Sequence, residues 1–286
     1  MGEVWTVLKV LQWTTGYLQE RGVDNGRLES ELLLADTLGC ERIGLYLNFD
    51  RPMTGEELKT FRERVGRRAR REPLQYIMGQ TEFWSLPFKV APAVLIPRAD
   101  TEVLVEEALR LAPESRRILD VGTGSGAIAV ALAHELPDAQ VEAVDVSREA
   151  LAVAEENAQL NGVAQRVDCH WADMAELPPG PYDLIVSNPP YIETAELEKL
   201  MPEVRDHEPR QALDGGADGL SCYRLLTEAA RQRLLPGGWL MVEIGCDQAA
   251  AVSALFSAAG FESVATRKDY AGLDRVVTAR QPQTTT

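Results

Sequence analysis

A glycine-rich loop between a buried strand and a helix most constrains how this chain can fold. Arg117–Val121 is an apolar, strand-like segment, and Gly122-Thr123-Gly124-Ser125-Gly126 separates it from a helical pattern that begins at Ala127. Glycines at alternate positions let the backbone turn sharply and let a ligand lie against bare peptide groups. The unit predicts an α/β fold with a ligand site at this loop.

Strand-like and helix-like segments alternate along the rest of the chain. This alternation implies a mainly parallel sheet with helices on both faces. Two final stretches, 262–266 and 275–279, are expected to pair antiparallel at one edge. The other predicted strands are 141–145, 167–171, 182–187 and 239–244, and the predicted helices are 127–134, 148–160 and 221–235, the last ended by Pro236-Gly237-Gly238.

The N-terminal part of the chain has a helical pattern instead. Apolar residues recur at helical spacing over 4–18 and 28–38, and a glycine follows the second segment, as is common at a helix end. A third helix is predicted over 56–71, because Thr54 and Glu57 have the spacing of a capping box. These segments predict a small helical bundle.

Changes in pattern divide the chain into four parts. Aromatic and β-branched residues over 80–90 suggest a hairpin. The polar C-terminal residues are expected to fray. The predicted parts are a helical domain over 1–74, a β-hairpin linker over 75–97, an α/β domain over 98–280 and a disordered tail over 281–286.

Composition and charge exclude several classes of protein. The sequence contains no stretch of about 18 uncharged apolar residues, so it predicts no transmembrane helix. The N-terminus lacks a secretion signal, so we expect a cytoplasmic protein. The four cysteines and three histidines are too scattered to predict a metal site. The net charge of −15 arises entirely within residues 91–286, which disfavours direct DNA binding by that part.

The glycine loop favours a nucleoside ligand without phosphates. Its pattern is GxGxG, and neither lysine nor arginine lies within the loop to meet a pyrophosphate. Asp145 follows Gly126 by nineteen residues and ends the next predicted strand, where a carboxylate can accept hydrogen bonds from both ribose hydroxyls. These features predict S-adenosylmethionine as the cofactor. The alternative is a tight strand–helix turn in which Asp145 only caps the following helix.

A second motif, Asn188-Pro189-Pro190-Tyr191, follows the predicted strand over 182–187. The prolines stiffen the turn and leave carbonyl groups free as acceptors, Asn188 adds an acceptor, and Tyr191 adds a flat face with a polar tip. Two acceptors that hold both hydrogens of a planar NH2 group orient its nitrogen toward an electrophile. The motif therefore predicts methyl transfer to such a nitrogen. The alternative is a rigid loop before a helix.

These motifs together resemble a known family. The glycine loop and the NPPY motif resemble class I S-adenosylmethionine-dependent methyltransferases that act on planar amino groups. Within that group, Leu95-Ile96-Pro97-Arg98 followed by Thr101-Glu102, after an N-terminal helical domain, resembles the HemK/PrmC family. Its members methylate the glutamine side-chain amide of the GGQ motif in class I peptide-chain release factors, leave S-adenosylhomocysteine, and modulate translation termination.

The resemblance implies a Rossmann-like fold with a mainly parallel seven-stranded sheet and a small N-terminal helical bundle. One departure is visible: the family pattern IPRPETE is IPRADTE here, with Ala99 and Asp100. Because Asp100 keeps the negative charge, we expect this departure to have little consequence.

The resemblance also implies roles for individual residues around a cofactor and a glutamine amide. The cofactor residues would be Gly122, Thr123, Gly124, Ser125 and Gly126 around the methionine part, Asp145 at the ribose, Trp171 near the adenine with Asp173 as a second candidate, and Asn188. The substrate residues would be Asn188 and the backbone of Pro189 as acceptors for the amide, Pro190, and Tyr191 as a wall. The catalytic residues would be Asn188, Pro189 and Tyr191, with no general base, because the methylated amide can lose its proton to water.

Two other functions compete with this one. An amino-methyltransferase acting on nucleic acid would share the NPPY motif, but it would need a basic groove or a target-recognition domain, which the sequence lacks. A non-catalytic S-adenosylmethionine-binding protein would have no use for the motif.

The expected partner is a class I release factor, docked by the N-terminal domain of a monomer. The arginines over 62–71 either contact the substrate protein or ribosomal RNA, or form a solvated helix face. Gly215–Gly219 is a candidate border of the substrate channel.

Overall fold

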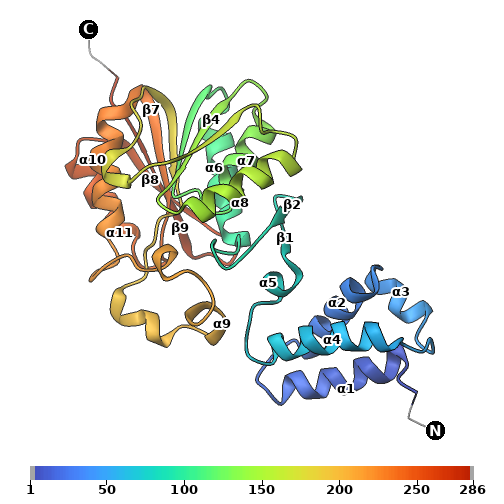
Figure 1. Cartoon of the computed structure of the whole chain (residues 1–286). Helices are drawn as coiled ribbons and strands as arrows, with labels where there is room; N and C mark the ends of the chain where they lie inside the picture. Colours follow the sequence, from blue (N-terminus) through green and yellow to red (C-terminus); the bar gives the residue numbers. More distant parts are fainter. Residues whose placement is uncertain (1–3, 284–286) are drawn as a thin grey trace. The chain divides into compact units, whose positions relative to one another are not determined.

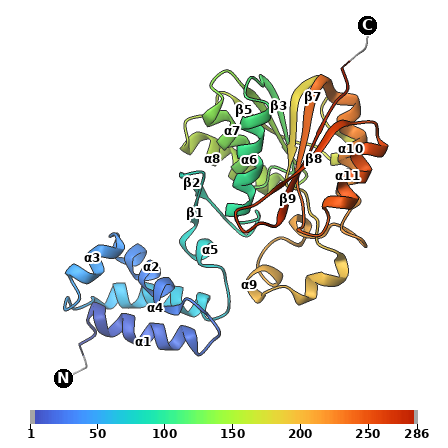
Figure 2. The same ribbon diagram turned by 180° about the vertical axis from the view of Figure 1, so that it is seen from behind.

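The structure is a computed structural model that describes residues 4–283 as two units. The helical unit comprises the described residues up to Gly79 together with Met201–His207, and the α/β unit comprises Gln80–Leu200 and the described residues from Glu208 onward. Figures 1 and 2 show both units from opposite sides. Residues 1–3 and 284–286, which include half of the expected tail, lie outside the described residues. Within 4–283, no helix is long and apolar enough to cross a membrane.

Amphipathic helices around one apolar core form the helical unit. The predicted capping box is confirmed, because Glu57 N–H donates to Thr54 Oγ1 (3.2 Å) and Thr54 N–H donates to Glu57 Oε2 (2.8 Å). The six-residue helix α3 was not predicted, since so short a segment shows little periodicity. The helices are α1 (Val7–Gln19), α2 (Gly26–Leu38), α3 (Arg42–Leu47), α4 (Gly55–Arg68), α5 (Leu74–Met78) and α9 (Pro202–Arg205).

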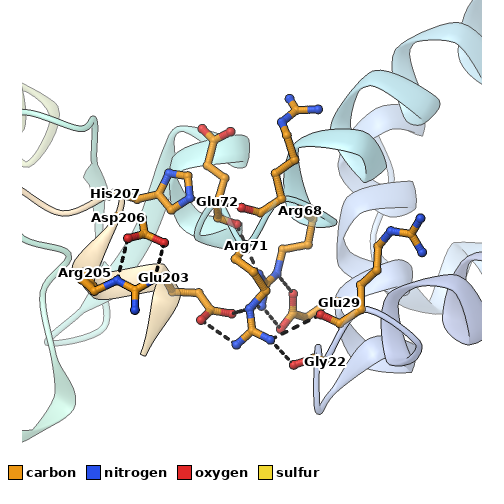
Figure 3. A network of polar contacts seen from close by, with 11 residues as sticks. Gly22, Glu29, Arg68, Arg71, Glu72, Glu203, Arg205, Asp206 and His207 are labelled. Atoms are coloured by element: carbon orange, nitrogen blue, oxygen red, sulfur yellow. Dashed lines mark hydrogen bonds and ion pairs between the residues drawn. The ribbon is translucent and has the colours of Figure 1, made fainter. Parts of the chain in front are cut away.

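The arginines at the end of α4 are engaged inside the helical unit. The buried Arg68 side chain pairs with Glu29 of α2, and its Nη2 donates to Glu203 Oε1 (2.9 Å). Arg71 Nη2 donates to Glu203 Oε2 (2.7 Å), so Glu203 lies between two guanidinium groups (Figure 3). Burial raises the pKa of Glu203, but the hydrogen bonds from Arg71 and Arg68 outweigh it and hold the pKa below its usual range. These contacts assign Met201–His207, which follows the NPPY motif by ten residues, to the helical unit.

Two more members of the arginine run are also paired. Arg64 Nη1 lies 2.6 Å from Asp36 Oδ2, and Arg67 Nη2 lies 2.5 Å from Glu72 Oε1. Four of the six arginines are thus held by carboxylates of their own unit. The run is therefore mostly an internal scaffold and not a uniformly solvated face.

A seven-stranded sheet with strand order β5-β4-β3-β6-β7-β9-β8 forms the centre of the α/β unit. The first five strands of this order run parallel, and β9 pairs antiparallel with both β7 and β8, as predicted for the last two strands. The α/β prediction is confirmed. The strands are β3 (Arg117–Val121), β4 (Gln140–Asp145), β5 (Val167–Trp171), β6 (Tyr182–Ser187), β7 (Leu234–Glu243), β8 (Glu262–Lys268) and β9 (Asp274–Arg280).

Helices cover both faces of this sheet (Figures 1 and 2). The first apolar core contains buried residues of α6 (Ala99–Leu111), α7 (Ala127–Glu135) and α8 (Arg148–Leu160). The second contains those of α10 (Ser221–Arg233) and α11 (Ala249–Ala258). The strands between the two cores are apolar on both faces, which explains why their sequences lack a polar alternation.

Strand order brings the two sequence motifs together. The chain runs outward from β3 through β4 to β5, and then returns to place β6 on the other side of β3. The register pairs Val121 with Ser187, the residues that precede the glycine loop and the NPPY motif. Because the two loops leave neighbouring parallel strands in opposite directions, a crevice opens between them, where α/β proteins bind ligands.

Several predicted boundaries shift: the helix expected over 56–71 ends at Arg68, and the strand expected over 262–266 continues to Lys268. The boundary between the helix and the strand around residue 234 is wrong for a physical reason. The helix expected over 221–235 ends at Arg233, and β7 already begins at Leu234 and continues through Pro236-Gly237-Gly238. Backbone hydrogen bonds hold this glycine pair in the strand, because Gly237 N–H donates to Gln281 O (3.0 Å) and Gln281 N–H donates to Gly238 O (2.8 Å). Tertiary pairing thus overrides the turn signal.

The predicted hairpin is present as β1 (Gln80–Phe83) and β2 (Leu86–Lys89). Its two-residue turn, Trp84-Ser85, has positive φ at both positions, as a type I′ hairpin turn requires. Asn157 of α8 ties the hairpin into the α/β unit: Lys89 N–H donates to Asn157 Oδ1 (2.7 Å), and Asn157 Nδ2 donates to the carbonyl of Ser125 in the glycine loop (2.8 Å).

Candidate active site

The glycine loop turns the chain from β3 into α7 and leaves open space beside two of its glycines. Gly122 and Gly124 have φ of 71° and 56°, and a Cβ added to either would meet no atom within 4 Å. The backbone conformation therefore selects glycine there, and the space beside it is open to a ligand. At Gly126 a Cβ would lie 3.1 Å from the Cβ of Ala154, so this glycine serves the close packing of α7 on α8.

Asp145 ends β4 and fixes the glycine loop from the neighbouring strand. Gly124 N–H donates to Asp145 Oδ2 and Ser147 N–H donates to Asp145 Oδ1, both at 2.9 Å. Each carboxylate oxygen retains a second lone pair, because a carboxylate offers about four acceptor positions. Asp145 can thus hold the loop and still accept hydrogen bonds from a ribose diol.

Asp120 lies buried under the loop. Thr123 Oγ1 donates to Asp120 Oδ2 (2.6 Å), while Asp120 Oδ1 has no hydrogen-bond partner among the described residues. Burial raises the pKa of Asp120 from 3.8 to about 7, against a smaller lowering by the Thr123 hydrogen bond. This carboxyl group stabilises the loop from within and does not line the cavity.

A cavity of about 390 Å³ lies at the carboxyl ends of β3, β4 and β6, entirely within the α/β unit. One part of its wall comes from the glycine loop, Asp145 and the segment 172–174. The other comes from Pro97-Arg98, Thr101, Asn188, Pro190 and the segment 209–214. The cavity thus joins the residues expected at the cofactor to those expected at the substrate amide.

Most of the predicted site residues line this cavity, and some do not. Gly122, Thr123, Gly124, Ser125, Asp145, Asp173, Asn188 and Pro190 line it, whereas Gly126, Trp171, Pro189 and Tyr191 are not part of its wall. The Trp171 ring is 48% exposed, and its Nε1 donates to the carbonyl of Val146 (2.9 Å). In this structure the ring packs on the chain after β4 and not inside the cavity.

Asn188 points one end of its amide at the helix α6. Its Nδ2 donates to Thr101 Oγ1 (3.2 Å). Thr101 follows the LIPR motif (residues 95–98) by three residues, so the segment that begins with this motif directly contacts the NPPY motif. Because Nδ2 is engaged, the Oδ1 of Asn188 is the atom left to accept a hydrogen bond in the cavity.

Tyr191 is fixed through both its backbone and its hydroxyl group. Gln248 Nε2 donates to the carbonyl of Tyr191 (2.9 Å), and the Tyr191 hydroxyl donates to Glu243 Oε1 (3.4 Å). Burial and the nearby Glu243 raise the pKa of Tyr191, so the phenol stays protonated. The predicted loop Gly215–Gly219 packs here, since a Cβ at Gly215 would lie 2.8 Å from the Cα of Tyr191. That glycine allows the close approach of the two segments.

Arg98 connects the LIPR segment to the far side of the cavity. Its Nη2 donates to Glu208 Oε1, and the carboxyl group of Glu208 is almost fully buried. Burial raises the pKa of Glu208, although Arg98 opposes this effect. Since Glu208 begins the cavity-lining segment that returns to the α/β unit, Arg98 anchors that segment.

Sequence reasoning missed Glu208 and Glu243 and gave Thr101 no role of its own. A weak signal existed for Glu243, because it is the one carboxylate in the apolar stretch Trp239–Ile244. Glu208 lies among other charged residues and gave no signal. In the described part of the chain, no three His, Cys, Asp or Glu side chains gather where a metal ion could be held.

Sequence comparison relates both parts of the chain to known families. Residues 9–79 match the PrmC N-terminal domain, and residues 99–208 match the methyltransferase small domain. A release factor glutamine methyltransferase of Geobacter sulfurreducens is 57% identical over 97% of this chain and 98% of its own length. The release factor glutamine methyltransferase of Chlorobaculum tepidum is 44% identical over 96% of both chains.

Solved structures agree on the fold alone. The hMettl16 catalytic domain, in complex with MAT2A 3'UTR hairpin 6, has a TM-score of 0.58 at 16% identity and covers 78% of this chain and 84% of its own. A methyltransferase from Pyrococcus furiosus has a TM-score of 0.52 at 20% identity and covers 70% of this chain and 90% of its own.

Proposed function

This chain belongs to the release factor glutamine methyltransferase family, and we propose that it methylates the side-chain amide nitrogen of the GGQ glutamine in class I peptide-chain release factors. It is an S-adenosylmethionine-dependent methyltransferase. One observation carries the proposal beyond family membership: a single cavity has both the glycine loop with Asp145 and the Asn188 amide in its wall. Cofactor and amide would therefore meet in the same space.

The residues around the glycine loop fit S-adenosylmethionine. The bare backbone at Gly122 and Gly124 leaves room for the methionine part, and Asp145 has free acceptor capacity for the ribose hydroxyls. Asp173, which also lines the cavity, is the candidate for the adenine amino group. Trp171 would have to change its contacts to reach the adenine, so we assign it a lesser role.

The NPPY motif fits a planar amide as the acceptor of the methyl group. Asn188 Oδ1 and the carbonyl of Pro189 would accept hydrogen bonds from the two hydrogens of the glutamine NH2 group. This grip would turn the lone pair of the nitrogen toward the methyl group and favour the change toward tetrahedral geometry. Pro190 lines the cavity and would limit how the amide can lie, whereas Tyr191, which is not part of the cavity wall, would support the loop.

Charge explains why the site needs no strong base. The bound cofactor supplies a methyl group on a positively charged sulfonium, and its transfer disperses that charge. No histidine lines the cavity. The methylated amide nitrogen is acidic enough to release its proton to water, so the chain's part is to hold and orient the amide.

The experiment that tests this function is mass spectrometry of a purified class I release factor after incubation with the protein and S-adenosylmethionine. We expect the mass of one methyl group on the GGQ peptide, absent when the Asn188→Ala variant replaces the wild-type protein. An RNA or DNA oligonucleotide in the same assay serves as the competing acceptor. Methylation of the oligonucleotide with an unmodified release factor would refute the proposal.

We assign docking of the release factor to the helical unit, because every proposed cofactor and amide residue lies in the α/β unit. Exposed apolar side chains of Ile43 and Leu47, one turn apart on α3, are the candidates for this contact. The pair Ile43→Ser/Leu47→Ser should raise the KM for the intact release factor and leave the KM for a short GGQ peptide unchanged. Equal KM values for the intact factor in both proteins would contradict this role.

A further inference from the structure

Glu243 is a buried carboxyl group beside the NPPY motif to which the function above gives no task. It ends β7, is 2% exposed, and follows Val242, which pairs in register with Ser187 of β6. Glu243 and Asn188 are therefore neighbours at the ends of adjacent strands. A carboxylate is costly to bury, so its presence at the end of an apolar strand calls for a role.

Two hydroxyl groups of the site contact this carboxyl group. Tyr191 Oη donates to Glu243 Oε1 (3.4 Å), and the Thr101 hydroxyl lies near enough to lower the pKa of the carboxyl group, whose buried Oε2 has no hydrogen-bond partner among the described residues. Thr101 also accepts the hydrogen bond from Asn188 Nδ2 (3.2 Å). Thr101 thus stands between Asn188 and Glu243, and the residues come from α6, the NPPY loop and β7.

The direction of these hydrogen bonds follows from the number of protons. A threonine hydroxyl has one hydrogen, and an ionised carboxylate can only accept. If Thr101 donates its hydrogen to Glu243, only its lone pairs remain for Asn188. Asn188 must then turn its NH2 end toward Thr101 and its Oδ1 toward the cavity.

The orientation of Asn188 decides whether it can hold a glutamine amide. With Oδ1 toward the cavity, it accepts a hydrogen bond from the substrate NH2 group. With the amide turned over, two NH2 groups would face each other and neither could accept. An asparagine without a fixed partner would populate both orientations.

We propose that Glu243 is a positioning residue that, through Thr101, holds the Asn188 amide in its acceptor orientation and, through a direct hydrogen bond, holds Tyr191. The proposal rests on the assignment of Asn188 as the residue that binds the substrate amide. Glu243 touches neither cofactor nor substrate, because it does not line the cavity, whereas Thr101 and Asn188 do.

The charges around Glu243 make its ionisation state sensitive to pH near neutrality. Burial raises its pKa from 4.5 to about 7, while the Thr101 hydrogen bond and Arg275 lower it and Asp100 raises it. Arg275 is shared, since its Nη2 lies 3.1 Å from Asp269 Oδ2 and 3.4 Å from Asp100 Oδ2. Tyr191 and Tyr223, the other titratable neighbours, stay protonated because burial raises the pKa of both. A protonated Glu243 can donate to Thr101, and the Thr101 hydroxyl is then free to donate to Asn188 instead of accepting from it.

Glu243→Gln tests the proposal, because glutamine keeps the shape but loses the charge that strengthens hydrogen bonds from Thr101 and Tyr191 and that titrates with pH. We expect kcat for release factor methylation to fall about tenfold or more, by analogy with the loss of one preorganised polar group, and the Kd of S-adenosylmethionine to stay within about twofold. In the wild-type protein kcat should rise with pH through about 7 as Glu243 ionises, and Glu243→Gln should lack this rise. Glu107→Gln, another buried glutamate of the α/β unit, is the matched control.

Thr101 provides an independent test should Glu243→Gln fold poorly. Thr101→Val should lower kcat to a similar extent, Thr101→Ser should restore turnover relative to valine, and Thr278→Val on β9 controls for the loss of a buried hydroxyl. The double variant Thr101→Val/Glu243→Gln should be no slower than the slower single variant, since both act on one chain of hydrogen bonds.

Unchanged kcat and an unchanged pH profile in Glu243→Gln, or equal turnover of Thr101→Val and Thr101→Ser, would overturn the proposal. Neither result would affect the function proposed above, which fails only if the wild-type protein leaves the release factor unmethylated.

Discussion

Replacing Asp145 separates its structural work in the glycine loop from its proposed work at the cofactor ribose. The carboxylate accepts two backbone N–H groups at 2.9 Å, from Gly124 and Ser147. Asp145→Asn retains one acceptor oxygen and loses the charge, while Asp145→Ala removes every acceptor. The two variants therefore remove part and all, respectively, of the hydrogen-bond acceptors of Asp145.

The size of the effect follows from these contacts. A hydrogen bond to a charged group contributes about 1.5–3 kcal/mol, and two bonds to one ribose are not fully additive. We expect Asp145→Ala to weaken binding of S-adenosylmethionine by about 2–4 kcal/mol, which is a factor of about 30 to 1,000 in Kd. Asp145→Asn should lose about half of that free energy, because one acceptor oxygen remains, although it no longer carries a charge.

Isothermal titration calorimetry with S-adenosylmethionine and S-adenosylhomocysteine measures this loss for both variants. Asp168→Asn is the matched control, since it removes the same charge from an exposed position on the neighbouring strand β5. Thermal unfolding without cofactor reports how much the loop itself has lost. A Kd equal to that of the wild-type protein in Asp145→Ala would refute the assignment of Asp145 to the ribose.

The remaining predictions concern the amide site and the stability of each unit. Asn188→Asp keeps an acceptor, but it has no N–H for Thr101 and adds a charge that stabilises the sulfonium ground state. Single-turnover methylation by this variant should therefore slow by about 100-fold or more, while cofactor binding changes little. Asn188→Ala should also lose turnover, and near-normal rates in both variants would remove Asn188 from the mechanism. Glu203→Ala leaves the buried Arg68 with Glu29 alone, so the free energy of unfolding in urea should fall by about 3 kcal/mol, whereas the exposed Glu63→Ala should have little effect. The pKa of Asp120 is raised in the folded chain from 3.8 to about 7, so its contribution to stability is complete at low pH and is lost as the pH rises through 7, by at most about 4 kcal/mol. Urea unfolding at pH 5 and pH 8 should therefore show a smaller loss of stability with pH for Asp120→Asn than for the wild-type protein; equal losses would mean that this carboxyl group is not shifted.

Local sequence patterns determined much of the fold. The capping box at Thr54 and Glu57 was predictable, because its two hydrogen bonds lie within one helical turn. The parallel sheet was predictable from the alternation of strands and helices, since a parallel connection needs a crossover. The start of β7 was not, because the glycine pair that indicates a turn is held in the strand by Gln281, more than forty residues away.

The active site, too, has some features that the sequence determined and others that only the tertiary structure determined. Its chemical groups, the glycine loop, Asp145 and the NPPY motif, are each continuous in sequence or fixed by a short spacing, and so the sequence by itself determined them. Only the tertiary structure brought Thr101 against Asn188, 87 positions further along the chain, and Glu243 near Thr101 and Tyr191. It also assigned Met201–His207 to the helical unit through Glu203. The physical reason is that a buried ion pair or hydrogen-bond chain depends on which elements pack together, and a periodicity of two or 3.6 residues does not carry that information.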